Sequence, residues 1–469
     1  MRHMLAIGCF PLLLCLWAAA APAEEPLAFP GAEGFGAHAA GGRGGKVYVV
    51  TTLEDYHPGA GARDAVTRKK TGEVILPAQP AIAPEPPVPG SLRQAVDAEG
   101  PRMVVFAVSG TIALKAPLVI RRPFITIAGQ SAPGGGICLR RYGVSVSDTH
   151  DVVIRHLRIR PGDETRREVD GLSVGACQNV VVDHCSTSWA VDENLSVSGA
   201  GGTDITVQWC FITESLHDST HSKGPHGMGS LIRSDGRVTF HHNLYAMNNT
   251  RNPRPGTYGD PGGIHLDFRN NFIYNWGSGA GYSAKDPANI NYVANFVQPG
   301  PAAKFSRRIA FTIGGETTRM HASGNRLQDG ETVITDDWAM IDKALPGTRL
   351  DAPFPAGDIK TESAEAARAA ILAHGGASLP LRDGVDARIA AHVRDLGGRI
   401  INSQTEVGGW PELEQGVAAP DADGDGMPDA WEKVRALNSA DPSDGAVIDP
   451  KSGYSNLEAY LNSLVPAGN

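Results

Sequence analysis

Two short segments of the chain repeat one another and place acidic side chains at matched positions. Asp170-Gly-Leu-Ser-Val174 aligns with Glu193-Asn-Leu-Ser-Val197, 23 residues further on, and Asp192 adjoins the second segment. Carboxylates held within about 5 Å of one another repel strongly unless a cation or a shared proton intervenes. A cluster of oxygen ligands suits a hard cation, most simply Ca²⁺. The alternative is a solvated acidic edge, and the spacing alone leaves both open.

The region after these acids carries basic and titratable side chains. They are His221, Lys223, His226, Arg233, Arg251 and Arg254. An acidic patch that binds a cation, next to a basic patch, fits a polyanionic substrate. The cation bridges protein acids to substrate carboxylates, and Lys or Arg bind the neighbouring carboxylates. For each basic residue taken alone, an ordinary surface charge is the alternative.

A seven-residue pattern recurs along the middle of the chain and predicts the scaffold that positions these residues. The pattern begins with a polar residue, alternates with apolar or aromatic residues, and often ends in Asn. It occupies residues 151–157, 179–185, 204–210, 237–243, 265–271, 289–295 and 319–325, at spacings of 28, 25, 33, 28, 24 and 30 residues. Irregular repeats of short strands are typical of a parallel β-solenoid, in which each repeat is one coil. A β-sandwich or propeller would show more hairpin turns.

The seventh position of the pattern should stack from coil to coil at a spacing of about 4.8 Å. We expect Asn243, Asn271, Asn295 and Asn325 to form an internal ladder, because Asn tolerates left-handed turns and can bond to backbone and to itself.

Four cysteines follow the N-terminal region, namely Cys138, Cys177, Cys185 and Cys210. They allow three pairings. Cys185 and Cys210 share the ladder position on neighbouring coils. Their spacing fits either a disulfide or a pair of stacked thiols, and the sequence does not choose between them.

The composition and the N-terminus exclude several classes of protein. The formal net charge of −9 argues against a nucleic-acid-binding protein, and 41% hydrophobic residues argue against wholesale disorder. Arg2, an apolar run and a small-x-small site ending at Ala23 predict a signal peptide over residues 1–23, cleaved near Ala23. We therefore expect a secreted protein, periplasmic or extracellular. No later stretch reaches the roughly 18 apolar residues of a membrane span.

The C-terminal tail contains a twelve-residue calcium-loop pattern. Acids stand at positions 1, 3, 5, 9 and 12 and glycine at position 6, as Asp421, Asp423, Asp425, Asp429, Glu432 and Gly426. A dockerin-like partner contact would use two such loops, and the sequence shows one. We therefore favour a structural Ca²⁺ that fixes the tail against the solenoid.

These observations divide the chain into four parts. They are a signal peptide (1–23), a β-helix domain with an N-terminal leader (24–345), a helical extension packed on the solenoid (346–415) and a calcium-loop tail (416–469). Residues 362–374 and 383–396 have helical composition and spacing. Residues 60–90 form a long exposed loop before a short helix.

An ordered set of short segments resembles a known family. The segments are 29–36, 90–96, 105–112, 179–184, 221–226, 240–243, 251–254, 270–276, 382–388 and 406–411. In this order they resemble bacterial pectate lyases of the first polysaccharide lyase family. The resemblance covers almost the whole mature chain. It implies an all-β, right-handed parallel β-helix, here with a small helical C-terminal region and an EF-hand-like loop.

The resemblance also implies an activity, Ca²⁺-dependent β-elimination on polygalacturonate that yields 4,5-unsaturated products, with the enzyme a monomer. Arg251 stands at the position of the family's catalytic base and Lys223 at that of its substrate-binding lysine. A guanidinium is a very weak acid, so a base role needs positive neighbours that disfavour its charged form. The family often has a second Arg where this chain has Gly256.

The resemblance completes a set of site residues. Calcium binding is assigned to Asp170, Asp192 and Glu193. The basic patch, of which residues 221–226 and 251–254 also match family segments, assigns substrate binding to Arg254, His221, His226 and Arg233. Asp183 and His184 match structural residues of the family that lie beneath the site.

Three other functions stay open. A lyase for methyl-esterified pectin would not need the acidic cluster. A glycoside hydrolase would use paired carboxylates roughly 5–10 Å apart. A non-catalytic solenoid would bind a uronate polysaccharide without turnover.

Overall fold

A computed structural model describes residues 25–466 of the chain. The predicted signal peptide, residues 1–23, lies outside the described residues. Within residues 25–466, no helix has the length and apolar character needed to cross a bilayer.

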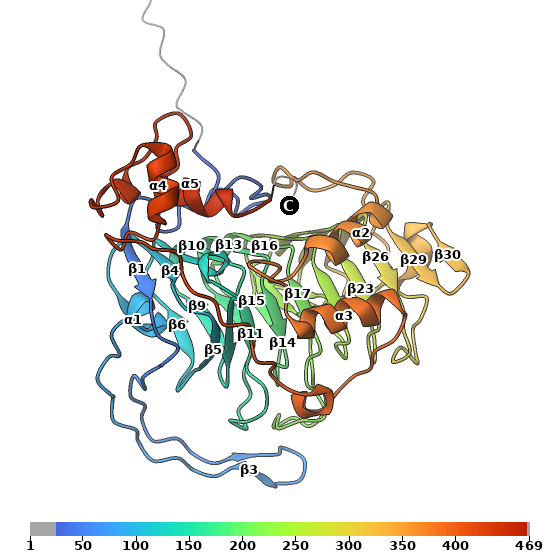
Figure 1. Cartoon of the computed structure of the whole chain (residues 1–469). Coiled ribbons are helices and arrows are strands. Elements are labelled where there is room, and N and C mark those ends of the chain that lie inside the picture. Colours follow the sequence, from blue (N-terminus) through green and yellow to red (C-terminus); the bar gives the residue numbers. More distant parts are fainter. Residues whose placement is uncertain (1–24, 467–469) are drawn as a thin grey trace, which may run out of the picture.

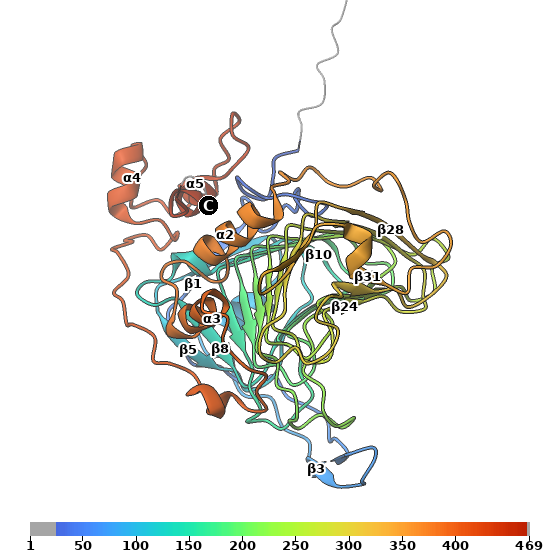
Figure 2. The ribbon, with the colours of Figure 1, turned by 90° about the vertical axis from the view of Figure 1, so that its right-hand side faces the viewer.

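Three sheets of mainly parallel strands wrap around one core and run along the molecule (Figure 1, Figure 2). Sheet A consists of β1 (Lys46–Val50), β4 (Arg102–Phe106), β7 (Ile125–Ala128), β10 (His150–Arg155), β13 (Gln178–Asp183), β16 (Thr203–Gln208), β19 (Arg237–His241), β22 (Ile264–Arg269), β25 (Ala288–Val293) and β28 (Thr318–Ser323). Sheet B consists of β5 (Gly110–Ala113), β8 (Ile137–Arg140), β11 (Arg158–Arg160), β14 (Ser186–Ser188), β17 (Phe211–Thr213), β20 (Leu244–Ala246), β23 (Phe272–Tyr274), β26 (Phe296–Gln298), β29 (Arg326–Asp329) and the antiparallel β30 (Thr332–Ile334). Sheet C consists of β6 (Leu118–Ile120), β9 (Val144–Ser147), β12 (Leu172–Gly175), β15 (Leu195–Gly199), β18 (Leu231–Ser234) and β21 (Arg254–Gly256).

The sequence repeats correspond to the coils of this solenoid. Each seven-residue segment contributes one strand of sheet A, from β10 to β28, and neighbouring strands pair in parallel, as Val180 does with Ile205. The predicted parallel β-helix is confirmed, and the antiparallel sandwich and propeller are excluded. A small sheet of β24 (Gly281–Tyr282), β27 (Phe311–Thr312) and β31 (Ile341–Asp342) accompanies the last coils.

The four asparagines form the predicted ladder inside the solenoid. The backbone amide of Asn243 donates to Oδ1 of Asn271 (3.1 Å), that of Asn271 to Asn295 (3.0 Å), and that of Asn295 to Asn325 (2.9 Å). All four side chains are buried. Each amide thus supplies hydrogen bonds to backbone groups that water does not reach.

The left-handed residue of this turn is the one before the ladder position. His184, Trp209 and His242 have φ values of 48°, 54° and 53°. Hydrogen bonding, rather than tolerance of left-handed backbone, therefore explains Asn at the ladder position. The rings of the left-handed residues stack on one another, with Trp209 and His242 centroids 4.4 Å apart.

The four cysteines are buried free thiols, so no disulfide joins Cys185 to Cys210. Burial raises the pKa of the Cys210 thiol well above its usual value. The ladder position thus accepts either an amide or a pair of stacked thiols.

The N-terminal leader crosses the outer face of sheet A on a row of threonines. The backbone amide of Gly36 donates to Oγ1 of Thr206 (2.8 Å), and that of Gly42 donates to Oγ1 of Thr126 (2.9 Å). A Cβ atom at Gly36 would lie 2.3 Å from the carbonyl oxygen of Val180. This close approach explains the glycine at this position of the leader.

The C-terminal segments cover sheet B and the beginning of sheet A. Helices α2 (Ala364–His374) and α3 (Gly384–Arg394) confirm the two predicted helices and pack on aromatic residues of sheet B. The tail helices α4 (Asp429–Arg435) and α5 (Asn456–Ser463) cover Met103 and Val105 on β4. Short 3₁₀ helices are η1 (Gly129–Ser131), η2 (Asp337–Met340), η3 (Gln404–Val407) and η4 (Asp444–Ala446).

A two-stranded arm extends from the first coil. Residues 58–90 leave after β1 and return before α1 (Leu92–Asp97), and they contain the antiparallel pair β2 (Val66–Thr67) and β3 (Val74–Leu76). Most of its residues are exposed, as predicted for the loop 60–90.

Candidate active site

The predicted metal ligands lie where loops enter consecutive strands of sheet C. Asp170 stands two residues before β12 and Glu193 two residues before β15. The two strands pair in parallel with Leu172 opposite Leu195. Asp170 and Glu193 therefore occupy the same position on neighbouring coils, as the repeated segment predicts.

These acids form a tight group. One carboxylate oxygen from each of Asp170, Asp192 and Glu193 lies within 4.8 Å of the others. The backbone amide of Glu193 donates to Oδ1 of Asp170 at 3.2 Å. Burial and the nearby charge of Asp192 raise the pKa of Asp170. Three carboxylates this close are a hard-cation arrangement by donor type.

The two histidines predicted to bind substrate are buried and face Asp192. Nε2 of His226 lies 2.6 Å from Oδ1 of Asp192, and Nε2 of His221 lies 3.4 Å from Oδ2. Nδ1 of His221 accepts a hydrogen bond from the backbone amide of Lys223 (3.0 Å), which assigns the proton of the neutral ring to Nε2. Although burial acts in the opposite direction, the contacts with both histidines hold the pKa of Asp192 below its usual range.

Arg251 contacts the acidic group from the next coil. Its Nη1 donates to Oε1 of Glu193, which is itself buried. The backbone of Arg251 has φ 60°, a left-handed conformation that is uncommon outside glycine and asparagine. Arg251 is the only guanidinium that pairs with this acidic group in the described residues. The loop between β20 and β21 therefore holds it at one defined point.

The remaining predicted basic residues surround this point. Arg254 opens β21 and is half-buried, and burial together with the charges of Arg251 and Arg233 lowers its pKa. Arg233, on the neighbouring strand β18, donates from Nε to the carbonyl of Thr257 (2.8 Å) and lies over the ring of Tyr258. Lys223 is exposed and forms no ion pair within residues 25–466.

Sequence reasoning missed one acid at this site. Oε1 of Glu168 accepts from the backbone amide of Ser222 (2.7 Å), and Oε2 lies 3.4 Å from Nε2 of His221. Glu168 thus joins the loop that carries His221 to the loop that carries Asp170. Its spacing of two residues before Asp170 was the signal that could have identified it.

The tail forms a second group of convergent carboxylates. Asp421, Asp423 and Asp425 lie within 4.8 Å of one another, and so do Asp425, Glu432 and Asp444. Within the described residues, neither carboxylate oxygen of the fully buried Glu432 has a hydrogen-bond partner. Burial raises the pKa of Asp425 and of Glu432 to about 7, and neighbouring carboxylates add to both shifts.

Two tail residues differ from the loop pattern. Asp429 joins neither group among residues 25–466; its Oδ1 accepts from the backbone amide of Ala422 (2.8 Å) at the start of α4. Asp444, which sequence reasoning missed, takes part instead. It stands 12 residues after Glu432 and outside the loop motif, so no local spacing indicates it.

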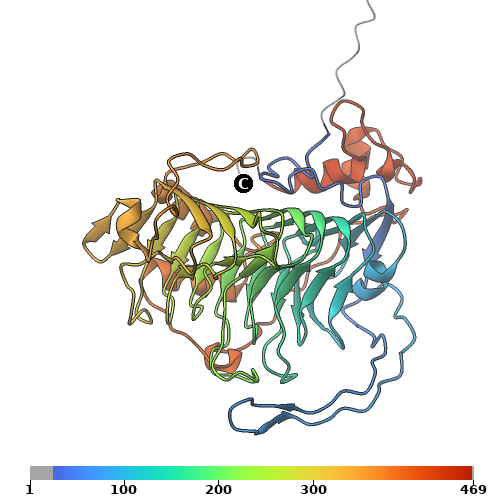
Figure 3. The same ribbon diagram turned by 180° about the vertical axis from the view of Figure 1, so that it is seen from behind.

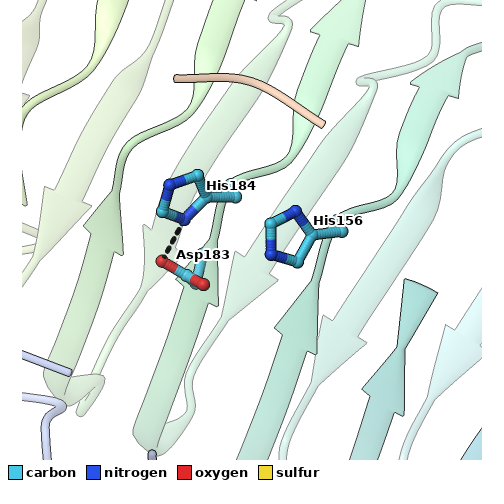
Figure 4. A group of neighbouring side chains, drawn as sticks. All are labelled: His156, Asp183 and His184. Atoms are coloured by element: carbon cyan, nitrogen blue, oxygen red, sulfur yellow. Dashed lines mark hydrogen bonds and ion pairs between the residues drawn. The ribbon is translucent and has the colours of Figure 1, made fainter. Parts of the chain in front are cut away.

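Figure 4 shows a third group, His156, Asp183 and His184, buried beneath the turn from sheet A to sheet B. Asp183 accepts from Nε of Arg155 (2.8 Å) and from Nε2 of Gln208 (2.8 Å), and its Oδ1 lies 2.7 Å from Nδ1 of His184. This network satisfies the carboxylate internally, in agreement with the structural role expected for Asp183 and His184.

Comparison with known proteins gives a consistent picture. No family model matches the chain. A probable pectate lyase C from Emericella nidulans is 37% identical over 455 residues, which cover 94% of each protein. A probable pectate lyase C from Aspergillus fumigatus is 35% identical over 97% of this chain and 98% of that protein. The solved structure of the major allergen from cedar pollen aligns with 74% of this chain and 92% of its own, with 18% identity and a TM-score of 0.49.

These sequence relatives are fungal, so the expected bacterial branch of the family is not confirmed. Their identity extends over nearly the whole of each protein, solenoid, helical region and tail together. The chain therefore belongs to the pectate lyase family of polysaccharide lyases.

Proposed function

We propose that this protein is a Ca²⁺-dependent pectate lyase that cleaves polygalacturonate by β-elimination and releases 4,5-unsaturated oligogalacturonides. The observation that carries this proposal is the group Asp170, Asp192 and Glu193, of which Glu193 is in direct contact with Arg251. It combines oxygen ligands for a cation with a guanidinium at the same point of the surface.

The acidic residues fit Ca²⁺ by donor type and charge. Three carboxylates share one small region, and Arg251 is the guanidinium that pairs with one of them, Glu193. A bound Ca²⁺ supplies an electrophile for the uronate carboxylate and stabilises the negative charge that develops next to it. His221 and His226 hold the Asp192 carboxylate in place through their contacts with its two oxygens.

The basic residues carry the proton chemistry and substrate binding. Arg251 removes the proton at C5, α to the uronate carboxylate. The C4–O bond then breaks, its electron pair stays with the glycosidic oxygen, which takes up a proton from water, and a double bond forms between C4 and C5. Burial and two neighbouring guanidiniums lower the pKa of Arg254. Arg254, Arg233 and Lys223 bind neighbouring uronate carboxylates.

The alternatives are less well supported by the geometry. A pectin lyase has no use for three convergent carboxylates. Hydrolysis uses carboxyl pairs roughly 5–9.5 Å apart with room for water, whereas one of these acids is engaged by a guanidinium. A purely binding solenoid does not account for a left-handed Arg251 pressed against the acids.

Ultraviolet absorbance of a conjugated unsaturated uronate tests the proposal directly. Purified protein is mixed with polygalacturonate in the presence of calcium or of a chelator. Absorbance that rises with calcium and stops with chelator supports elimination. New reducing ends without absorbance would indicate hydrolysis, and binding with neither signal would indicate a non-catalytic solenoid.

A second candidate site is a structural Ca²⁺ in the tail. The unpartnered buried oxygens of Glu432, together with Asp421, Asp423, Asp425 and Asp444, support it. Gly426 lies against Val47 and Val105 of the first coils, so a cation there would tie the tail to sheet A.

We also propose the remaining sequence-based assignments. The protein is secreted after cleavage near Ala23 and acts as a monomer. The β-helix domain spans 24–345, the helical extension 346–415 and the tail 416–469.

A further inference from the structure

The arm, residues 58–90, is fixed at both ends rather than free in solvent. At its base, Asp55 binds Arg93 through two contacts of 2.8 Å, and both side chains are buried. Along its length, Ala60 bonds to Ile82 and Arg63 bonds to Gln79 through paired backbone hydrogen bonds. The arm is therefore a continuous ribbon, and Figure 3 shows it running alongside the coils.

The tip of the arm rests on the loop that carries the site histidines. The backbone amide of Lys69 donates to the carbonyl of Ser222 (2.8 Å), and Nη2 of Arg68 donates to the carbonyl of Ser219 (3.1 Å). The amide of Ser222 donates in turn to Glu168, which contacts His221. Two hydrogen bonds thus connect the tip with Glu168, and the contacts of His221 with Glu168 and Asp192 continue this path to the acidic group. The tip and Asp170 are about 100 residues apart in sequence.

The side chains at the tip are positively charged in a protein of net charge −9. Arg68 pairs with Glu73 at 3.3 Å. Lys69 and Lys70 are exposed and form no ion pair within residues 25–466. Lys223, also exposed, follows Ser222 directly. Because the tip is held by backbone contacts, both lysine side chains stay available to a ligand.

A second cationic position lies further back along the arm. A cleft of about 210 Å³ separates the arm from the first coils. It is lined by Arg63 and Gln79 of the arm and by Val119, Tyr142 and Arg167 of the coils. Neither guanidinium forms an ion pair in the described part of the chain. Tyr142 stands two residues before β9, which pairs with β12.

We propose that the arm is the outer wall of an extended binding site for a polyuronate chain. Lys69 and Lys70 bind uronate carboxylates next to the acidic group, and Arg63 and Arg167 bind a carboxylate one or two coils towards the N-terminus. This inference rests on the proposed function for its substrate class. An ordinary solvated loop would have a charged tip as well, but it would not anchor that tip by its backbone to the loop of His221.

Two double variants test the wall. Lys69→Ala/Lys70→Ala and Arg63→Ala/Arg167→Ala leave the backbone anchors and the acidic group in place. The control is Lys433→Ala/Lys451→Ala, which removes two exposed lysines of the tail. Binding of polygalacturonate is measured by affinity electrophoresis, and KM and kcat are measured on polygalacturonate and on a galacturonate trimer.

For each arm variant we expect affinity for the polymer to fall about 5- to 30-fold, from the loss of two exposed charge contacts. The expected kcat stays within about twofold, and the arginine variant should affect the trimer less than the polymer. Highly methyl-esterified pectin should show no difference between the arm variants and the control, because it lacks the charges. Polymer binding that matches the control in both arm variants would overturn the inference.

The two proposals fail in different ways. Absence of unsaturated product in the unmodified protein would reject the lyase function, and electrophoretic binding would still report on the arm. Normal elimination together with unchanged polymer affinity in both arm variants would reject the wall alone.

Discussion

The ion pair between Arg251 and Glu193 makes a quantitative prediction about calcium binding. Arg251 contacts an oxygen of Glu193, one of the three proposed calcium ligands. With all three carboxylates ionised, as cation binding requires, the group formed by these acids and Arg251 carries a charge of −2. Arg251→Gln changes this charge to −3 and removes the guanidinium from the ligand. We expect the variant to lose lyase activity and yet to bind Ca²⁺ more tightly.

The size of the effect follows from the contact. A calcium ion lies about 2.4 Å from a ligand oxygen. The guanidinium bound to the same carboxylate would then stand roughly 5 Å from the ion. At that distance, and even at the dielectric constant of water, a double and a single positive charge repel by about 1.7 kcal/mol. Kd for calcium should therefore fall by more than about tenfold.

Isothermal titration calorimetry measures this change. Both proteins carry Glu432→Gln, so that the tail loop does not contribute to the signal. Arg233→Gln is the matched control, because Arg233 also lies on sheet C but donates to Thr257 rather than to the acidic group. Its calcium Kd should stay within about threefold of the parent, since its charge is farther from the ligands and screened by water.

An unchanged or higher Kd in Arg251→Gln would refute the reasoning, because it would mean that Glu193 does not bind the cation. Circular dichroism spectra show whether the Arg251→Gln variant is folded, so that misfolding can be excluded as the cause of a changed calcium Kd. Loss of a partner leaves the buried Glu193 carboxylate unpaired, which costs stability in the absence of calcium.

Three further predictions concern stability. Asn271→Ala removes the acceptor of the Asn243 backbone amide and three more hydrogen bonds, so the free energy of unfolding, measured by guanidinium denaturation, should fall by about 4 kcal/mol. The exposed Asn438→Ala should change it by less than about 0.5 kcal/mol, and equal effects would contradict the ladder's role. Chelator should lower the melting temperature of the unmodified protein. The Glu432→Gln variant should have a lower melting temperature even without chelator, and chelator should change it less. An identical response of both proteins would argue against a tail cation. Burial holds the pKa of His156 well below its usual value, so the fold keeps this ring neutral, and its contribution to stability is present above about pH 6.5 and is lost as the pH falls below that value. Since neither ring nitrogen of His156 has a hydrogen-bond partner within residues 25–466, His156→Phe should reduce the loss of stability between pH 7.5 and pH 5, and an unchanged loss would show that this ring does not titrate on unfolding.

The sequence by itself determined the coils and the stacking of the acids. The seven-residue pattern marks one strand of sheet A on each coil from β10 to β28, and Asn at its last position marks the ladder. Asp170 and Glu193 lie together because the segments that follow them pair in register. Such features are local, since strand periodicity and a fixed position in a repeat are enough to place a side chain on one face.

Only the tertiary structure decided how the loops between strands meet. The contact of Ser222 with Glu168 joins residues 54 apart, and that of Arg251 with Glu193 joins residues 58 apart. The burial of His221 and His226 against Asp192 and the inclusion of Asp444 in the tail group have the same origin. These segments carry no repeating pattern, because loops of differing length take their conformation from hydrogen bonds and charges supplied by distant parts of the chain.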